Sequence, residues 1–169
     1  MALNMVINMG SNFAGESICK VQGALQPGNI DVLAWSWGMS SQSGSSRMGG
    51  GAAGGAGKSN FQDLSFTKYV DSASNALMLC LAKGQRIPVC VFMALKDGGP
   101  PIMYTQITMT DVMVSSISTG GSGGQDRFTE NVTLNFGKVK FSYFKSDGNQ
   151  FNPTKDFAWD IGANSALSA

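Results

Sequence analysis

The sequence lacks histidine altogether and has few charged residues, with 12 Lys and Arg and 11 Asp and Glu in 169 positions. Without histidine, a Ser-His-Asp triad, a Cys-His dyad, an HExxH zinc helix and a His-ligated haem are impossible. The net charge of +1 also excludes the broad basic surface of a nucleic-acid-binding protein. Charged residues make up 14% of the chain, whereas about 25% is usual. We therefore expect either a surface rich in Ser, Thr, Asn and Gly or a surface that other molecules largely cover.

Long apolar runs are missing as well. No stretch reaches the ~18 apolar residues that a membrane helix needs, so we expect no membrane insertion. Near the N-terminus the apolar Leu3, Met5 and Ile7 recur at every second position, which predicts a strand and not the apolar core of a signal peptide. The three cysteines lack CxxC spacing, which favours buried thiols in a chain that folds in a reducing compartment. Any export is therefore expected to proceed without a signal peptide.

The hydrophobic pattern predicts a mainly β chain with one helix. We expect a single domain over residues 1–169, built as a small β-barrel or a sandwich of two sheets. The flanking helix is expected at about residues 72–83, with Asp71 or Ser72 as its N-terminal cap and Gly84 just past its end. Residues 38–58 read as an extended Gly-rich loop. A loop of this length in a compact domain predicts either disorder or a partner that orders the loop.

Two strands carry further information. Between Arg127 and Phe144 the apolar residues move from even positions, up to Phe136, to odd positions from Val139. This change of phase predicts a β-bulge at Gly137 and Lys138. In the strand expected at residues 30–37, Trp35 and Trp37 share one face, where packing in the core is favoured over a stacking platform for a ligand.

The opposite face of that strand carries the small residues Val32, Ala34 and Ser36. Such a face packs beneath another layer or lines an open passage where bulky or charged groups would adhere. The pattern alone favours the packing interpretation by roughly two to one, and it leaves the second open.

Motifs of nucleotide binding and catalysis lack their context. The segment GAGKS at residues 55–59 resembles a phosphate-binding loop, but Ala52 stands where that motif needs glycine, and a strand is expected to follow instead of a helix. A literal GxGxxG at residues 49–54 lies in the same Gly-rich stretch and lacks a βαβ unit. We therefore expect no cofactor and no metal.

Charged side chains also have structural explanations. Asp126 and Glu130 flank Arg127, which favours a local ion-pair network over an acid-base pair. Three lysines without an intervening acid predict a solvated strand face or an interface with acids of a neighbouring copy. These lysines are Lys138, Lys140 and Lys145.

Three long segments together resemble the haemolysin-coregulated protein (Hcp) family of bacterial type VI secretion. They are IDVLAWSWGMS at residues 30–40, QDLSFTKYVD at residues 62–71 and VSSISTGGSGGQDRFTENVTLNF at residues 114–136. Gly15-Glu16-Ser17 and residues 157–161 fit the beginning and end of the same family. The sequence departs from the family's pattern at Asn29, where an acid is expected.

This resemblance implies a structural and carrier function without catalysis. Family members form a small β-barrel with a flanking helix and assemble into six-membered rings. The rings stack into a tube inside a contractile sheath, topped by a spike protein, and the tube is expelled toward a target cell. The lumen of the rings also holds small effector proteins. The chain is thus expected to assemble in the bacterial cytoplasm and then to be secreted.

The resemblance also suggests roles for three groups of residues. Val32, Ala34 and Ser36 become candidates for contact with effectors in the lumen. The candidates for ring stacking through the Gly-rich loop are Ser45, Arg47, Met48, Gly50 and Lys58. The candidates for turns at the ring edge are Asp97, Gly98, Gly99 and Ser122.

Two alternatives remain at the level of sequence. A tail-tube-type protein of a phage-like contractile particle would share the ring and differ in its partners. A monomeric β-barrel would bind a small apolar or sugar ligand near the tryptophans.

Overall fold

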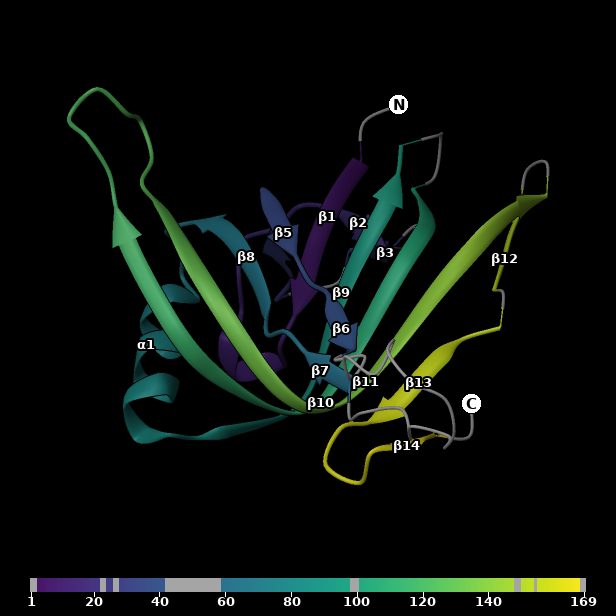
Figure 1. Cartoon of the computed structure of the whole chain (residues 1–169). Helices are drawn as coiled ribbons and strands as arrows, with labels where there is room; N and C mark the ends of the chain where they lie inside the picture. Colours follow the sequence, from purple (N-terminus) through teal and green to yellow (C-terminus); the bar gives the residue numbers. More distant parts are fainter. Residues whose placement is uncertain are drawn as a thin grey trace, which may run out of the picture.

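The computed structural model describes residues 3–21, 24–25, 28–41, 59–97, 101–147, 150–153 and 155–167, and it contains one α-helix and many strands in these ranges (Figure 1). The first half of the chain forms β1 (Leu3–Asn8), the 3-10 helix η1 (Ser11–Phe13), β2 (Lys20–Val21), β3 (Ala24–Leu25), β4 (Ile30–Asp31), β5 (Ala34–Ser36), β6 (Met39–Ser41), β7 (Ser59–Phe61) and β8 (Leu64–Tyr69). The second half forms α1 (Ser74–Lys83), β9 (Arg86–Lys96), β10 (Ile102–Gly120), β11 (Thr129–Asp147), β12 (Gln150–Pro153), β13 (Phe157–Asp160) and β14 (Ser165–Ala166).

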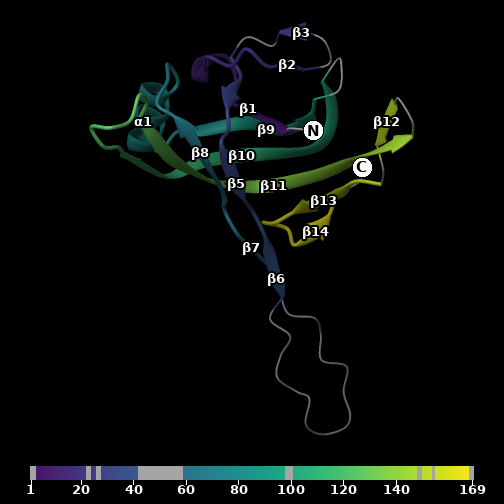
Figure 2. The same ribbon diagram turned by 90° about the horizontal axis from the view of Figure 1, so that it is seen from above.

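The long antiparallel pair of β10 and β11 is the centre of the sheet. In the described part of the chain, ten strands share one sheet, which runs in the order β14-β13-β11-β10-β9-β1-β4. Strands β8 and β12 also pair with β11, and β5 pairs with β8. The hairpins β2–β3 and β6–β7 form two small separate sheets. Figure 2 shows that β6 and β7 extend away from the body of the barrel.

Residues 30–36 close this sheet into a barrel. Ile30 and Asp31 pair with β1, whereas Ala34 to Ser36 pair with β8. Between them the chain bends at Leu33, whose N–H donates to the carbonyl of Thr67 at 2.8 Å. Because the chain changes its partner strand here, one short segment joins both edges of the sheet.

Strands β10 and β11 bend together at Asp111 and Gly137. Asp111 has a φ of 58°, and a Cβ atom on Gly137 would lie 3.3 Å from its Oδ2. Register is the same on both sides of the bend, with Thr110 opposite Lys138 and Val112 opposite Phe136. Figure 1 shows the pair folded into two arms.

The predicted change of side-chain facing near Gly137 is therefore correct. The predicted β-bulge is wrong, because the pairing of β10 with β11 keeps its register at this point. Both strands reverse their facing at the same point, so Met109 and Val112 are both buried on the same core. The register shifts of β10 lie elsewhere, between Met103 and Thr105 against β9 and between Val114 and Ser116 against β11.

The main core lies inside the barrel and beneath α1. It combines Ile7, Phe92 and Ile107 with Leu134 and Leu77 of α1. A second, smaller cluster lies on the other side of the sheet formed by β1, β9 and β10, where the segment around Cys19 and Val21 covers it. Its buried members are Val6, Val21, Met93, Leu95 and Met103. The expected packing of Trp35 in the core is confirmed, since its ring centroid lies 4.7 Å from that of Phe92.

Helix α1 begins slightly later than predicted. Ser74 is its first residue, and neither Asp71 nor Ser72 occupies the cap position, which belongs to Ala73. Asp71 instead forms the preceding turn, where its Oδ1 accepts a hydrogen bond from the N–H of Ala73 at 3.0 Å. Gly84 ends the helix in the left-handed conformation, as predicted.

A buried lysine joins β8, β11 and the beginning of α1. Lys68 and Glu130 are fully buried and form an ion pair. The ammonium group also lies 2.9 Å from Asp71 Oδ1 and 3.0 Å from Ser74 Oγ. Glu130 therefore pairs with the residue directly opposite it on the neighbouring strand β8, and the prediction of a local network with Arg127 is wrong for this residue. A buried charge is stable only with such a complete set of partners.

The expectation of buried thiols holds for Cys80 and Cys90, while Cys19 is half-buried. Burial raises the pKa of Cys90 to about 12, with a smaller contribution from Cys80. Burial also raises the pKa of Cys19, and the nearby Asp31 and Asp97 add to this effect. Such thiols remain protonated at neutral pH and react slowly.

Removal of the buried ammonium group should destabilise the barrel strongly. Lys68→Met leaves two carboxylates without their counter-charge, so we expect a loss of about 3–5 kcal/mol in the free energy of unfolding. Lys138, which is exposed and 3.9 Å from Asp160, provides the control, because Lys138→Met should cost less than about 1 kcal/mol. Urea denaturation of both variants measures the difference. If Lys68→Met and Lys138→Met have equal free energies of unfolding, the buried network stabilises the barrel no more than an exposed ion pair does.

The bend can be tested at Asp111. Asparagine tolerates positive φ, whereas a β-branched residue does not. Asp111→Asn removes only the ion pair with the exposed Arg86, and Asp111→Val adds backbone strain. We expect the valine variant to be about 1–3 kcal/mol less stable than the asparagine variant in the same denaturation assay. An equally stable valine variant would contradict a strained bend.

Candidate functional site: a neutral polar sheet face

Four neighbouring strands present two rows of small uncharged side chains on their outer side. Strands β5, β8, β11 and β10 lie side by side, and their inward residues, such as Phe66 and Val132, belong to the core. The outward residues face each other across the strands. One row is Ala34, Thr67, Asn131 and Ser118, and the next is Ser36, Ser65, Thr133 and Ser116. We call these eight residues the polar face.

Hydrogen bonds within the polar face hold its side chains in place. Thr67 Oγ1 donates to Asn131 Oδ1 at 2.6 Å, and the hydroxyl oxygens of Ser65 and Thr133 are 3.2 Å apart. A shallow hollow of about 300 Å³ lies over β5, β8 and β11. Because Ser65, Thr67, Asn131 and Thr133 bind each other and the remaining side chains are small and uncharged, the face offers a molecule in contact with it few strong interactions.

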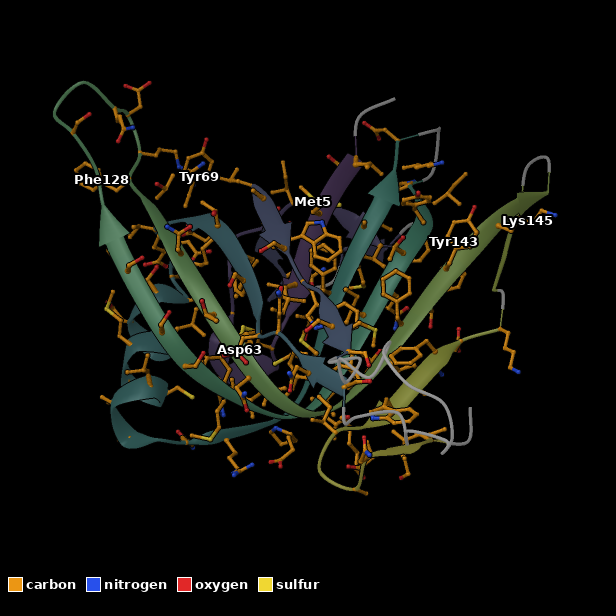
Figure 3. The ribbon with its side chains drawn as sticks, viewed as in Figure 1. Met5, Asp63, Tyr69, Phe128, Tyr143 and Lys145 are labelled. Atoms are coloured by element: carbon orange, nitrogen blue, oxygen red, sulfur yellow. The ribbon has the colours of Figure 1, made fainter. Side chains whose placement is uncertain are left out.

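A carboxylate lies beside the polar face. Asp63, labelled in Figure 3, accepts hydrogen bonds from Ser115 Oγ at 3.0 Å and from Asn135 Nδ2 at 2.9 Å. Farther along, the guanidinium group of Arg127 lies over the ring of Tyr69, 4.2 Å from its centroid. The charges nearest to the polar face are thus held by the protein's own groups.

The structure separates the three residues that the sequence placed on one strand face. Ala34 and Ser36 are exposed and belong to the polar face. Val32 is only 5% exposed and lies in the main core, so its predicted position on that face is wrong. The reason is the bend at Leu33, which interrupts the alternation of side chains between β4 and β5.

Most of the other predicted site residues lie outside this face. Asp97 and Ser122 are exposed, the first directly after β9 and the second at the tip of the β10–β11 hairpin. Figure 1 shows the end of β9 and this hairpin tip at the same end of the molecule. The remaining predicted residues lie outside the described part of the chain: Ser45, Arg47, Met48, Gly50, Lys58, Gly98 and Gly99.

Sequence reasoning missed six of the eight residues of the polar face. The signal was present in QDLSFTKYVD and ENVTLNF, where Ser, Thr and Asn alternate with core residues. The face forms only because β8 pairs with β11, although the paired residues are 60 or more positions apart in the chain. Alternation within one segment does not reveal that pairing.

Lys138 and Lys140 have partners within the chain. Lys138 lies 3.9 Å from Asp160, and Lys140 lies 3.2 Å from Asp156. Both acids flank or belong to β13, so the ion pairs support the attachment of this strand to β11. The predicted interface with acids of another copy is thus not needed to explain these two lysines.

Over the described ranges, no three His, Cys, Asp or Glu residues are grouped so that they could hold a metal ion. Within the same ranges, no helix is long and apolar enough to span a membrane. Apart from the methyl group of Ala34, the side chains of the polar face carry hydroxyl and amide groups, and the face is suited to contact with other molecules over a broad surface.

Comparison with known proteins gives consistent results. The family model described as "Type VI secretion system effector, Hcp" matches residues 11–143. The chain is 49% identical to protein hcp1 of Pseudomonas aeruginosa over 167 residues, which cover 97% of this chain and 98% of that protein. The crystal structure of Hcp1 from Salmonella typhimurium is 29% identical, with a TM-score of 0.76 over 99% of this chain and 100% of that chain.

A second solved structure, described as a type six secretion system protein, has a TM-score of 0.85 at 25% identity and covers 98% of this chain and 100% of its own. These likenesses confirm both the family resemblance of the sequence motifs and the mainly β fold with one helix. The barrel, its single helix and the matches over nearly the whole length lead to one conclusion: the chain belongs to the Hcp family, the secreted, non-enzymatic tube proteins of the type VI secretion system.

Proposed function

We propose that six copies of the chain close into a ring, that the rings stack into a tube, and that the polar face lines the lumen. The observation that carries this proposal is the polar face itself, which holds eight small side chains without charge or aromatic ring on four adjacent strands. Family membership supports the tube. A subunit with so few charges also suits an assembly in which neighbours cover much of the surface.

A neutral, hydroxyl-rich lumen suits transport. Effector proteins must enter, stay during assembly and leave after delivery, so each contact with the wall has to be weak. Hydroxyl groups that already bind each other, such as those of Ser65 and Thr133, cost little to cover and contribute little when covered. Exposed charges would bind oppositely charged cargo too strongly and repel the rest.

The partners of the tube follow from the same proposal. The tube lies within a contractile sheath, carries a spike protein at its tip and holds small effector proteins in its lumen. Assembly takes place in the bacterial cytoplasm, and sheath contraction expels the tube without a signal peptide. The segment predicted as a loop at residues 38–58 contributes to stacking. Its first residues form β6, which pairs with β7 and extends with it away from the barrel (Figure 2).

Substitution of Ser36 tests the role of the polar face. Ser36→Trp fills the hollow beside Ser65 and Thr67, so we expect effector co-purification to fall about tenfold, while size-exclusion chromatography still shows rings. Ser36→Thr keeps the hydroxyl group at nearly the same size and serves as the control. Undiminished effector binding by the tryptophan variant would contradict a lumenal polar face.

Secretion in culture tests the biological context. The protein should accumulate in the medium of an intact culture and should be missing from the medium of a strain without the sheath protein. Equal amounts in the two media would exclude export by sheath contraction. Release only together with cell lysis would contradict the proposed export by sheath contraction, and a monomer in size-exclusion chromatography would contradict the proposed ring.

A further inference from the structure

The outer side of α1 carries apolar side chains that the subunit leaves uncovered. The inner side, with Leu77 and Cys80, belongs to the core. On the outer side Leu79 is 54% exposed and the neighbouring Met78 is also exposed, whereas the exposed Leu81 lies at the flank of the helix, two positions from Leu79. A surface helix normally has polar residues there, whereas a helix that is apolar all round is normally covered on all sides. Leu79 and Met78 thus form an apolar surface that is suited to contact with another molecule.

The tip of the β10–β11 hairpin carries a second uncovered apolar group. Phe128 is 52% exposed, and Figure 3 shows it at the outer end of the hairpin. Its ring lies directly on Gly121, where a Cβ atom would lie 2.0 Å from the ring. The neighbouring Arg127 is held over Tyr69. Phe128 is thus presented in a fixed orientation, which lowers the entropic cost of binding.

The two uncovered groups have complementary charges beside them. Lys83 is the exposed last residue of α1, and Asp126 is exposed two positions before Phe128. Within the described ranges, neither side chain forms an ion pair. The nearby Arg86 is paired with Asp111. The apolar outer side of α1 with its cation Lys83 is therefore complementary to the hairpin tip, which presents Phe128 beside the anion Asp126.

We infer that the hairpin tip of one copy packs on the outer side of α1 of a second copy, with Phe128 against Leu79 and with Asp126 facing Lys83, which lies one turn farther along the same side of the helix. Figure 1 shows the tip and the C-terminal end of α1 on the same side of the molecule but at opposite ends. A contact that joins opposite ends of identical chains is heterologous and continues from copy to copy in one direction. The occupant is thus the next copy along a stack.

This inference rests on the proposed function, because it assigns the contact to successive rings of the tube. A single aromatic side chain and one exposed ion pair make a weak contact. In a ring, six such contacts form at once and reinforce each other, since the first contact raises the effective concentration of the others. We therefore expect stable stacks only from intact rings, and we expect added salt to weaken the stacks because it screens the exposed ion pair.

Charge reversal in two separate preparations tests the contact. In rings of Asp126→Lys the introduced lysine faces Lys83, and in rings of Lys83→Glu the introduced glutamate faces Asp126. Each preparation alone should stack at least about tenfold more weakly than the unsubstituted protein in sedimentation velocity at low salt. In an equal mixture, alternating rings bring opposite charges together at every contact, so stacking should return to within about twofold of the unsubstituted protein.

A second pair of variants tests the apolar part of the contact. Phe128→Ser should abolish stacks, whereas Phe128→Leu keeps an apolar knob and should retain most of them. Thermal denaturation verifies that all four variants fold. Singly reversed rings that stack normally, a mixture that stacks no better than its components, or unsubstituted rings that do not associate would each overturn the inference. The first two outcomes leave the proposed rings and tube intact. The third also contradicts the proposed stacking, and a chain that forms no rings would contradict the proposed function itself.

Discussion

The joint bend of β10 and β11 at Asp111 and Gly137 is the constraint on which the rest of the structure depends. Two strands of 19 residues each would form a long, nearly straight ribbon with one apolar side. The positive φ of Asp111 and the lack of a Cβ on Gly137 let both strands reverse their facing without loss of register. One arm then pairs with β9 and the other with β8, so a single hairpin forms both walls of the barrel.

The bend also separates two chemical environments. On one arm the sheet is covered on both sides, by the main core and by the smaller cluster around Met93 and Leu95. On the other arm only the inner side is covered, and the outer side carries the polar face. The buried pair of Lys68 and Glu130 fastens this second arm to the beginning of α1. The polar face thus lies on a rigid sheet, which suits a wall that contacts many different molecules.

Much of this architecture could be predicted from the sequence, but its long-range parts could not. Alternation predicted the N-terminal strand, which is β1 at Leu3–Asn8, and Gly84 marked the end of the helix. The phase change near Gly137 was visible, yet its cause required knowledge of the partner residue Asp111. Val32 was misplaced because a bend at Leu33 has no glycine or proline to mark it. Lys68 gave no sign of burial, since its four oxygen partners come from β8, the turn before α1, α1 itself and β11.

The central claim is that the polar face lines the open centre of a ring. Electron cryomicroscopy of the purified assembly tests it most directly. The account predicts a closed ring of six copies in which Ser36, Ser65 and Thr133 of every copy face the lumen. A ring with these side chains on its outer wall, or with the polar face buried between subunits, would contradict it.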